Sequence, residues 1–294
     1  MIVRVGTRSS RLALIQAGLV ADLLREAGQA VEIVELVTEG DLRPVDMSPG
    51  EGVFVAAIAR ALVAGEIDLA VHSAKDIPLE GDPGLVIGAY PGRADPRDAM
   101  VGRAGGTTLA NLPAGAVVGT DSPRRAGFLR AARPDLRVVP LHGNVDTRLR
   151  RLDAGEVDAL VLAAAGLDRL GCGDRIGERL SPEQVPPAPA QGALAAQVRR
   201  RDGALLDVLR SLDDIEVRTA VETEREVLAA TGGSCRAPVG ALAKVAGSRI
   251  RLLVGGVNSD GSGMKVETVE GPVGSAARMA REAGERLAAD VALR

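Results

Sequence analysis

The 294-residue chain is poor in aromatic residues, histidine, cysteine and lysine. It has no Trp, one Tyr and two Phe, so aliphatic side chains must fill its cores. With aromatics at 1% and a net charge of −3, it lacks both the stacking platforms and the basic field of a nucleic-acid-binding protein. Two His are too few for a His-based metal site. We therefore expect neither nucleic acid nor metal as a partner.

The two cysteines, Cys172 and Cys235, lie far apart in the sequence and form no disulfide framework. Such sparse thiols are typical of a reducing cytosol. No apolar run approaches the roughly 18 residues that a membrane span needs. Met1 leads directly into the strand-like sequence IVRV, with no signal-peptide pattern. The expected location is cytoplasmic, with no membrane partner.

Lysine is also scarce, since Lys75, Lys244 and Lys265 are the only lysines among 36 basic residues. The remaining cations are arginines, whose planar fork binds a carboxylate through two hydrogen bonds. Familiar catalytic patterns are missing: the sequence has no GxxxxGK[ST] phosphate loop and no GxSxG elbow. The arginines in particular loops are therefore the first candidates for ligand binding.

Strand and helix patterns recur in the same order in the first two thirds of the chain. Residues 2–5, 31–37 and 67–71 are strand-like, and residues 12–27 and 53–64 are helix-like. The order repeats from residue 116 to 163, with helices predicted at 123–132 and 145–154, and AGEIDLAV at 64–71 is matched by AGEVDALV at 154–161. Two similar βαβαβ units predict two related α/β lobes.

Pro-rich segments at 89–98 and 182–191 are typical of connections between the lobes. After residue 215 the pattern changes to a helix, short alternating strands and a final helix, which predicts a small α+β domain. The predicted domains are residues 1–92 with 191–212, residues 97–186, and residues 215–294.

Polar residues gather where four predicted strands end, and open α/β sheets bind ligands beyond the carboxyl ends of their strands. These residues are Arg8 and Ser10, then Lys75 and Asp76, then Thr120, Ser122, Arg124 and Arg125, and finally His142 and Arg148. Helix N-termini at these places add partial positive charge. The interlobe cleft is predicted to bind a ligand with several carboxylates or phosphates.

Two residues leave alternatives open. Asp76 is compatible with an ion pair to Lys75, with a helix cap, or with an acid or counter-ion for a cation formed in a reaction. Cys235 follows Gly232-Gly233 and precedes Pro238, a loop-like setting that is compatible with a structural thiol or a reactive one. A Cys-dependent hydrolase is the generic interpretation of a reactive thiol.

Eight segments, in order along nearly the whole chain, resemble the porphobilinogen deaminase family. They are GTRSSRLALIQA, VHSAKDIP, DPRDA, VGTDSPRRA, HGNVDTRL, AAGLDRLG, PAPAQGALA and GSCRAPVG. The resemblance implies an α/β fold with two periplasmic-binding-protein-like (type II) lobes, mixed sheets and a small C-terminal α+β domain. It implies a monomer that joins four porphobilinogen molecules head to tail into hydroxymethylbilane, with release of ammonia, in heme biosynthesis.

The same resemblance implies roles for individual residues. Asp76 would be catalytic, and Cys235 would carry a dipyrromethane cofactor through a thioether. Residues expected beside the cofactor are Lys75, Thr120, Ser122, Arg124, Arg125, Gln191 and Gly192. Residues expected to bind substrate are Arg8, Ser10, His142, Arg148 and Arg175.

The chain departs from the family pattern at several positions. His142 stands where the family usually has Arg, and Asp121 where it usually has Ser. Glu51 and Ala56 lie where many members have Lys. These changes remove fixed positive charge or add carboxylates, so we expect weaker binding of some substrate carboxylates. The alternative function is a non-catalytic, two-lobed anion-binding protein.

Overall fold

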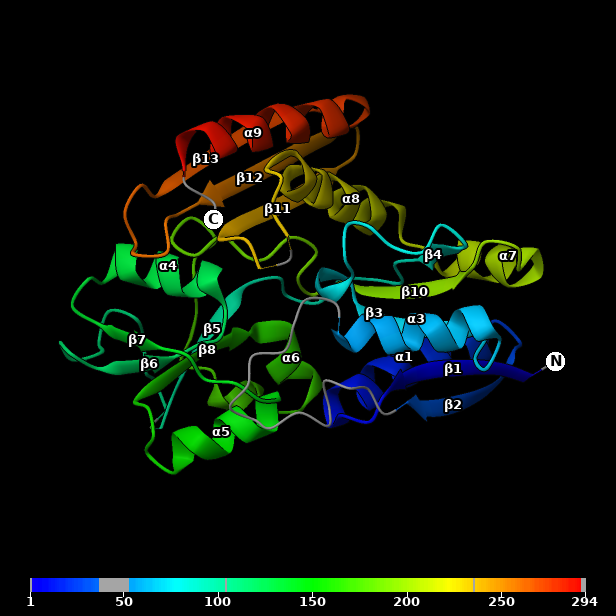
Figure 1. Ribbon diagram of the computed structural model, residues 1–294, viewed down its shortest axis with the longest axis horizontal. Coiled ribbons are helices and arrows are strands. Elements are labelled where there is room, and N and C mark those ends of the chain that lie inside the picture. The colour runs from blue at the N-terminus through cyan, green and yellow to red at the C-terminus, as the bar shows by residue number, and fades with distance from the viewer. Residues whose placement is uncertain (1, 37–52, 104, 235, 292–294) are drawn as a thin grey trace. The chain divides into compact units, whose positions relative to one another are not determined.

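The computed structural model describes residues 2–36, 53–103, 105–234 and 236–291 (Figure 1). The chain divides into two compact units, each described by itself. The first is Met1–Ala94 with Ala193–Arg218, and the second is Asp95–Gly192 with Thr219–Arg294. The segment from residue 219 onward groups with the second unit, and the predicted three-domain division stays a prediction.

The first unit is built on a five-stranded sheet with the order β2-β1-β3-β10-β4. Its strands are β1 (Ile2–Arg8), β2 (Ala30–Leu36), β3 (Leu69–Ser73), β4 (Leu85–Ala89) and β10 (Leu194–Arg199), and its helices are α1 (Arg11–Glu26), α3 (Val53–Ala64) and α7 (Gly203–Leu212). β1 is parallel to β2 and β3, whereas β10 is antiparallel to β3 and β4. The sheet is therefore mixed.

Alternation along β3 distributes its side chains to two cores. Leu69 and Val71 pack in the cluster that includes residues of α1 and α7, whereas Ala70 packs with residues of α3. This period of two is what a strand buried on both faces requires. In β1, a Cβ on Gly6 would lie 2.3 Å from Cδ1 of Ile67, so a larger residue there would require the buried Ile67 side chain to move.

His72 on β3 is 5% exposed, and its Nε2 lies 3.3 Å from Oε1 of Gln197. Burial lowers the pKa of His72 to about 4, although the hydrogen bond to Gln197 opposes that shift. The unfolded chain therefore binds a proton near its ordinary pKa of about 6.5, while the native state does not.

We predict that this difference removes about 3 kcal/mol of unfolding free energy as the pH falls from 6.5 to 4, and nothing above pH 6.5. Urea unfolding of the wild type and His72→Gln, repeated across this pH range, checks it. The stability gap between the two proteins should shrink toward pH 4. Parallel loss of stability in both would contradict the prediction.

The second unit contains another mixed five-stranded sheet, ordered β7-β6-β8-β5-β9. Its strands are β5 (Asp98–Gly102), β6 (Val117–Gly119), β7 (Arg137–Val139), β8 (Ala159–Ala163) and β9 (Glu178–Arg179), and its helices are α4 (Pro123–Ala132), α5 (Val145–Asp153) and α6 (Ala164–Arg169). β6 is parallel to β7 and β8, and β5 is antiparallel to β8 and β9. The parallel arrangement of the first unit is thus repeated, as the paired sequence motifs predicted.

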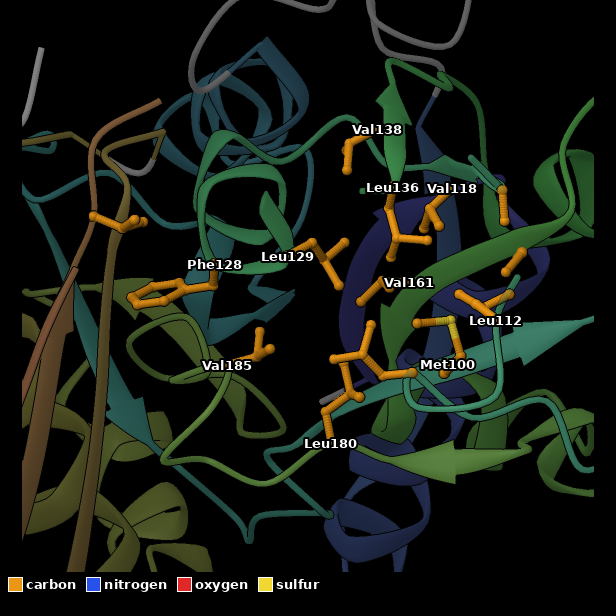
Figure 2. Close-up of a cluster of buried hydrophobic side chains, with 14 residues drawn as sticks. Met100, Leu112, Val118, Phe128, Leu129, Leu136, Val138, Val161, Leu180 and Val185 are labelled. Carbon is orange, nitrogen blue, oxygen red and sulfur yellow. The ribbon is translucent and has the colours of Figure 1, made fainter. Parts of the chain in front are cut away.

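The core of this unit also lies on both faces of its sheet. Figure 2 shows Phe128 and Leu129 of α4 in the same cluster as Met100 and Val161 from the strands. Leu160, next to Val161 on β8, instead belongs to the cluster with α5 and α6. Aliphatic residues fill almost all of both clusters, as the scarcity of aromatics requires.

The C-terminal part of the second unit has a separate antiparallel sheet, β11-β12-β13. Its elements are α8 (Ile215–Ala230), which enters the second unit at Thr219, β11 (Val239–Ala246), β12 (Arg249–Gly256), β13 (Lys265–Pro272) and α9 (Ala276–Asp290). Side chains of α8, α9 and the sheet share one buried cluster. The predicted fold class, two mixed-sheet α/β lobes with a small α+β part, is confirmed. Within the described ranges, no helix combines the length and apolarity that crossing a membrane needs.

The single tyrosine, Tyr90, ends the β4 region of the first unit and is 4% exposed. Its backbone N–H donates to Oδ1 of Asp213 at 2.7 Å. The guanidinium of Arg218 lies 5.1 Å from the ring centroid, within cation–π range. Tyr90 is thus fixed at the point where the chain leaves the first unit.

Candidate functional site

In the first unit, the predicted residues lie at one edge of the sheet. β1 and β3 are parallel, with Val5 opposite Leu69, so their carboxyl ends point the same way. Arg8 ends β1, and Ser10 is the N-cap of α1, where its Oγ accepts from the N–H of Ala13 at 3.4 Å. Lys75 and Asp76 follow β3 in a short 3₁₀ helix, Ala74–Asp76.

Asp76 is exposed in a segment that is held by its neighbours. The N–H of Ala74 donates to the carbonyl of Ala193 at 3.0 Å, and Nε2 of Gln16 donates to Oγ of Ser73 at 2.9 Å. The Asp76 carboxylate itself makes no hydrogen bond or ion pair with any described residue, Lys75 included. The ion-pair interpretation therefore finds no support, and the carboxylate is accessible to a ligand.

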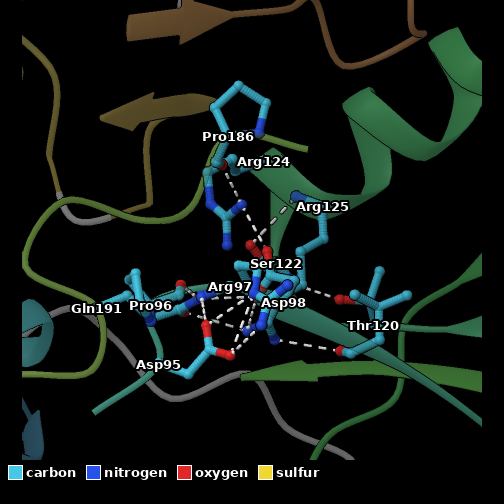
Figure 3. A network of polar contacts seen from close by, with 11 residues as sticks. Asp95, Pro96, Arg97, Asp98, Thr120, Ser122, Arg124, Arg125, Pro186 and Gln191 are labelled. Atoms are coloured by element: carbon cyan, nitrogen blue, oxygen red, sulfur yellow. Dashed lines mark hydrogen bonds and ion pairs between the residues drawn. The ribbon is translucent and has the colours of Figure 1, made fainter. Parts of the chain in front are cut away.

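In the second unit, a buried carboxylate organises the predicted cofactor residues (Figure 3). Asp98 is 0% exposed, and its oxygens lie 2.8 Å from Nη1 of Arg124 and 2.7 Å from Nη2 of Arg125. Gln191 donates from Nε2 to Oδ1 at 2.9 Å. Burial alone would raise the pKa of Asp98, but the two guanidinium charges outweigh it and hold that pKa far below its ordinary value.

Arg124 and Arg125 are therefore already engaged within the protein. Arg124 also donates to the carbonyl of Pro186 at 2.5 Å, and Arg125 to that of Val161 at 3.2 Å. Both side chains are almost completely buried. Their expected contact with a cofactor stays a prediction, while their contact with Asp98 is a function that sequence spacing did not indicate.

Thr120 and Ser122 shape the turn between β6 and α4. Oγ1 of Thr120 accepts from the N–H of Ser122 at 3.3 Å, and Oγ of Ser122 accepts from the N–H of Arg125 at 3.4 Å. Ser122 is the N-cap of α4, and Pro123 occupies its first turn. These hydroxyls position the turn and can still donate a hydrogen bond to a ligand.

The turn that carries Gln191 and Gly192 is held from α8. Ala190 has a φ of +65°, an unfavourable conformation for a residue with a side chain. Its N–H donates at 2.6 Å to the fully buried carboxylate of Glu224, which also accepts from the N–H of Ala243 at 2.7 Å. Glu224 thereby fixes the turn that presents Gln191 to Asp98.

Two half-buried arginines retain unneutralised charge. Nε of Arg148 donates to the carbonyl of Gly143, and Nη2 of Arg169 to that of Gly192, each at 2.7 Å. Neither forms an ion pair with a described carboxylate. Burial, and then the charge of Arg125, lowers the pKa of Arg148 to about 10, and burial also lowers the pKa of Arg169. Such cations suit a ligand with several carboxylates.

Arg169 was missed from the sequence, although it lies in the quoted segment AAGLDRLG and on α6, directly after β8. Arg175, which was predicted, lies 2.6 Å from Oδ1 of Asp153. The hydrogen bond to Asp153 raises the pKa of Arg175, so its charge is already satisfied. Its role in substrate binding stays a prediction.

Of the four residues that depart from the family pattern, the structure describes Asp121, His142 and Ala56. Nδ1 of His142 lies 2.7 Å from Oδ1 of Asp121. Ala56 is exposed on α3. Cys235 and Glu51 lie outside the described residues. Among those described, no group of His, Cys, Asp and Glu could hold a metal ion.

Cationic side chains at the ends of strands, together with the accessible carboxylate of Asp76, are typical of an α/β protein that binds an anionic ligand. Residues 3–207 match the family model "Porphobilinogen deaminase, dipyromethane cofactor binding domain", and residues 218–292 match "Porphobilinogen deaminase, C-terminal domain". The chain belongs to the porphobilinogen deaminase family, and the predicted membership is confirmed.

Two relatives show how much of the chain the similarity covers. A porphobilinogen deaminase of Roseiflexus sp. (strain RS-1) is 47% identical over 287 residues, covering 95% of this chain and 94% of the relative. One of Nocardia farcinica is 53% identical over 244 residues, covering 82% and 70%. Among solved structures, the second substrate binding domain of a putative amino acid ABC transporter from Streptococcus pneumoniae has a TM-score of 0.48 at 15% identity, covering 79% of this chain and 95% of that domain.

Proposed function

We propose that this chain is a porphobilinogen deaminase, a transferase of heme biosynthesis. It joins four porphobilinogen molecules head to tail into hydroxymethylbilane and releases one ammonia for each. The accessible Asp76 carboxylate, at the same edge of the sheet as Arg8 and Lys75, carries the proposal. A non-catalytic anion-binding protein would use the arginines but has no need of that carboxylate.

The arginines supply substrate binding. Each pyrrole bears an acetate and a propionate, so the growing chain is polyanionic. Arg148 and Arg169 are partly desolvated without a carboxylate partner among the described residues. A substrate carboxylate provides each guanidinium with an ion-pair partner. That pairing offsets the free-energy cost of burying the positive charge. Arg8, Ser10, His142 and Arg175 complete the proposed substrate contacts.

Asp76 supplies the chemistry. Loss of the aminomethyl nitrogen leaves a cation on the substrate, and the Asp76 carboxylate is the opposite charge that stabilises it. The same carboxylate accepts hydrogen bonds from pyrrole N–H groups and carries a proton toward the departing ammonia. Since it makes no hydrogen bond or ion pair with a described residue, both oxygens are available for these interactions.

The donor set fits a dipyrromethane cofactor, because a dipyrromethane carries four carboxylates and no metal. When bound, it supplies the pyrrole end to which the first substrate is joined. We assign its attachment to a thioether at Cys235. The proposed contacts are Lys75, Thr120, Ser122, Arg124, Arg125 and the Gln191–Gly192 turn. The proposed enzyme is a cytoplasmic monomer.

Mass spectrometry of the intact protein tests the proposal. Protein from cells that make porphobilinogen should exceed its sequence mass by one dipyrromethane. Cys235→Ser should lose this added mass and all turnover, because no other residue is proposed to hold the primer. Cys172→Ser is the matched control and should keep both. A folded, unmodified wild-type chain from such cells would refute the proposal.

A further inference from the structure

A groove runs beside α3 in the first unit, and the proposed mechanism does not use it. One wall is formed by Val55, Ala59 and Val63, which recur every four residues and therefore lie on one face of the helix. The other wall is the segment between β3 and β4, with Ile77 and Leu85. The cavity between the walls has a volume of about 660 Å³, within the usual range for a small-molecule site. We call it the α3 groove.

The walls of the α3 groove are apolar and open to solvent. Val55, Ile77 and Leu85 are buried, whereas Val63 is 47% exposed and extends the apolar surface to the rim. Ala56 contributes only a methyl group, so α3 does not cover the opening. An apolar molecule that enters the groove therefore loses contact with water on two sides.

Gln197 places one polar side chain in this apolar site. On β10, Ala196 and Val198 pack in the core that includes α1 and α7, so the side chain of Gln197 between them faces α3. Across the strands it lies opposite Ala70, which packs in the α3 core. Gln197 is 8% exposed and lines the groove.

The Gln197 amide has one partner among the described residues, Nε2 of His72, which lies 3.3 Å from its Oε1. Burial lowers the pKa of His72 to about 4, so the imidazole is neutral at neutral pH and its Nε2–H can donate to Oε1. The NH₂ of Gln197 is then without a hydrogen-bond partner in the described part of the chain. It is not among the sealed polar atoms there, so a ligand can reach it from the groove.

Charge at the rim distinguishes the α3 groove from the proposed substrate site. Glu80 and Asp82 line one side and Arg60 the other, so carboxylates outnumber guanidinium groups. A pyrrole with an acetate and a propionate would be repelled by this rim. An uncharged molecule would not.

We propose that the α3 groove is a binding site for an uncharged apolar molecule whose carbonyl oxygen accepts a hydrogen bond from the Gln197 amide. Such a molecule contacts Ile77 and Pro78, which directly follow Asp76. Occupancy restricts the segment that carries the Asp76 carboxylate and lowers turnover without competing with substrate. The effect on turnover rests on the proposed function, whereas binding in the groove does not.

Acetanilide is a suitable probe, because it is uncharged and joins one ring to one amide carbonyl. In ¹H–¹⁵N spectra of the holoenzyme, the side-chain NH₂ signals that Gln197→Leu removes should shift saturably as acetanilide is added. In calorimetric titrations, 3-phenylpropionate, which has a similar size but carries a carboxylate, should bind roughly fivefold more weakly because the rim opposes its charge. Acetanilide should lower kcat and leave the KM for porphobilinogen unchanged.

Variants test the groove and its amide separately. Ala59→Phe fills the space between the walls and should abolish the shift of the Gln197 signals. Gln197→Leu keeps the size of the side chain but removes the donor, so acetanilide should bind roughly fivefold more weakly. Gln16→Leu is the matched control, since Gln16 is another buried glutamine that bonds β3, through Ser73, but does not line the groove. It should keep the wild-type affinity for acetanilide.

The inference is overturned if the Gln197 signals do not respond to acetanilide, or if they respond equally in Ala59→Phe. An increase in KM with unchanged kcat would also overturn it, because the probe would then occupy the substrate site. Saturable binding in a protein that makes no hydroxymethylbilane would reject the proposed function and leave the groove site standing. Normal turnover without any binding of the probe would reject the groove site alone.

Discussion

Asp76→Asn is expected to lower kcat by about 10²–10⁴-fold, the usual contribution of a group that stabilises charge or moves a proton in a transition state. The amide keeps the size of the side chain but removes its negative charge and its ability to accept a proton. Because Asp76 has no hydrogen bond or ion pair with any described residue, the thermal unfolding midpoint should not change. Steady-state assays of hydroxymethylbilane formation, together with calorimetry, measure both quantities.

Glu80→Gln is the matched control for this variant. Glu80 is another exposed carboxylate four residues along the same segment, and it has no hydrogen bond or ion pair with a described residue. It should keep wild-type kcat, because it does not lie at the strand end. A fall in kcat of less than tenfold in Asp76→Asn, or an equal fall in Glu80→Gln, would remove Asp76 from the catalytic role.

Asp98→Ala is expected to destabilise the protein by about 3–5 kcal/mol, because it leaves two buried guanidinium groups without their anion. Arg124 and Arg125 are 3% and 6% exposed, so water cannot replace the lost carboxylate. The variant should also lose the hydrogen bond that orients Gln191. Unfolding in urea, followed by circular dichroism, gives the change in stability.

Asp135→Ala provides the comparison, since it breaks an ion pair with Arg133 that is exposed to solvent. Surface pairs contribute about 0–1 kcal/mol, so this variant should stay close to the wild type. If Asp98→Ala and Asp135→Ala lower the free energy of unfolding equally, burial does not determine how much the Asp98 ion pairs contribute to stability.

Local patterns predicted most helices, because capping and periodicity lie within a few residues. The predicted helices at 53–64 and 123–132 coincide with α3 and α4, and Ser122 with Pro123 marks the start of the latter. β5 and β10 were not recognised as strands. β5 begins with Asp98 inside a segment that resembles a linker, and β10 pairs antiparallel with β3, which lies more than 100 residues earlier. Such pairing is a tertiary property that no short window contains.

The site was predicted only as far as strand ends could be recognised. Lys75 and Asp76 do follow β3, and Ser122 does follow β6, as expected. The partner of Arg124 and Arg125 was not predicted, because Asp98 lies 26 and 27 residues away in sequence. Cys235 lies outside the described residues, so its assignment still rests on the sequence motif GSCRAPVG.

The buried position of Tyr90 gives the protein an intrinsic optical reporter. It is the only tyrosine and the chain has no tryptophan, so nearly all intrinsic fluorescence must come from this ring. The guanidinium of Arg218 sits over it, and its backbone is tied to Asp213, at the end of the first unit. Any change that shifts α8 or the segment after Tyr90 as the pyrrole chain lengthens should alter that emission, without a label and without a mutation.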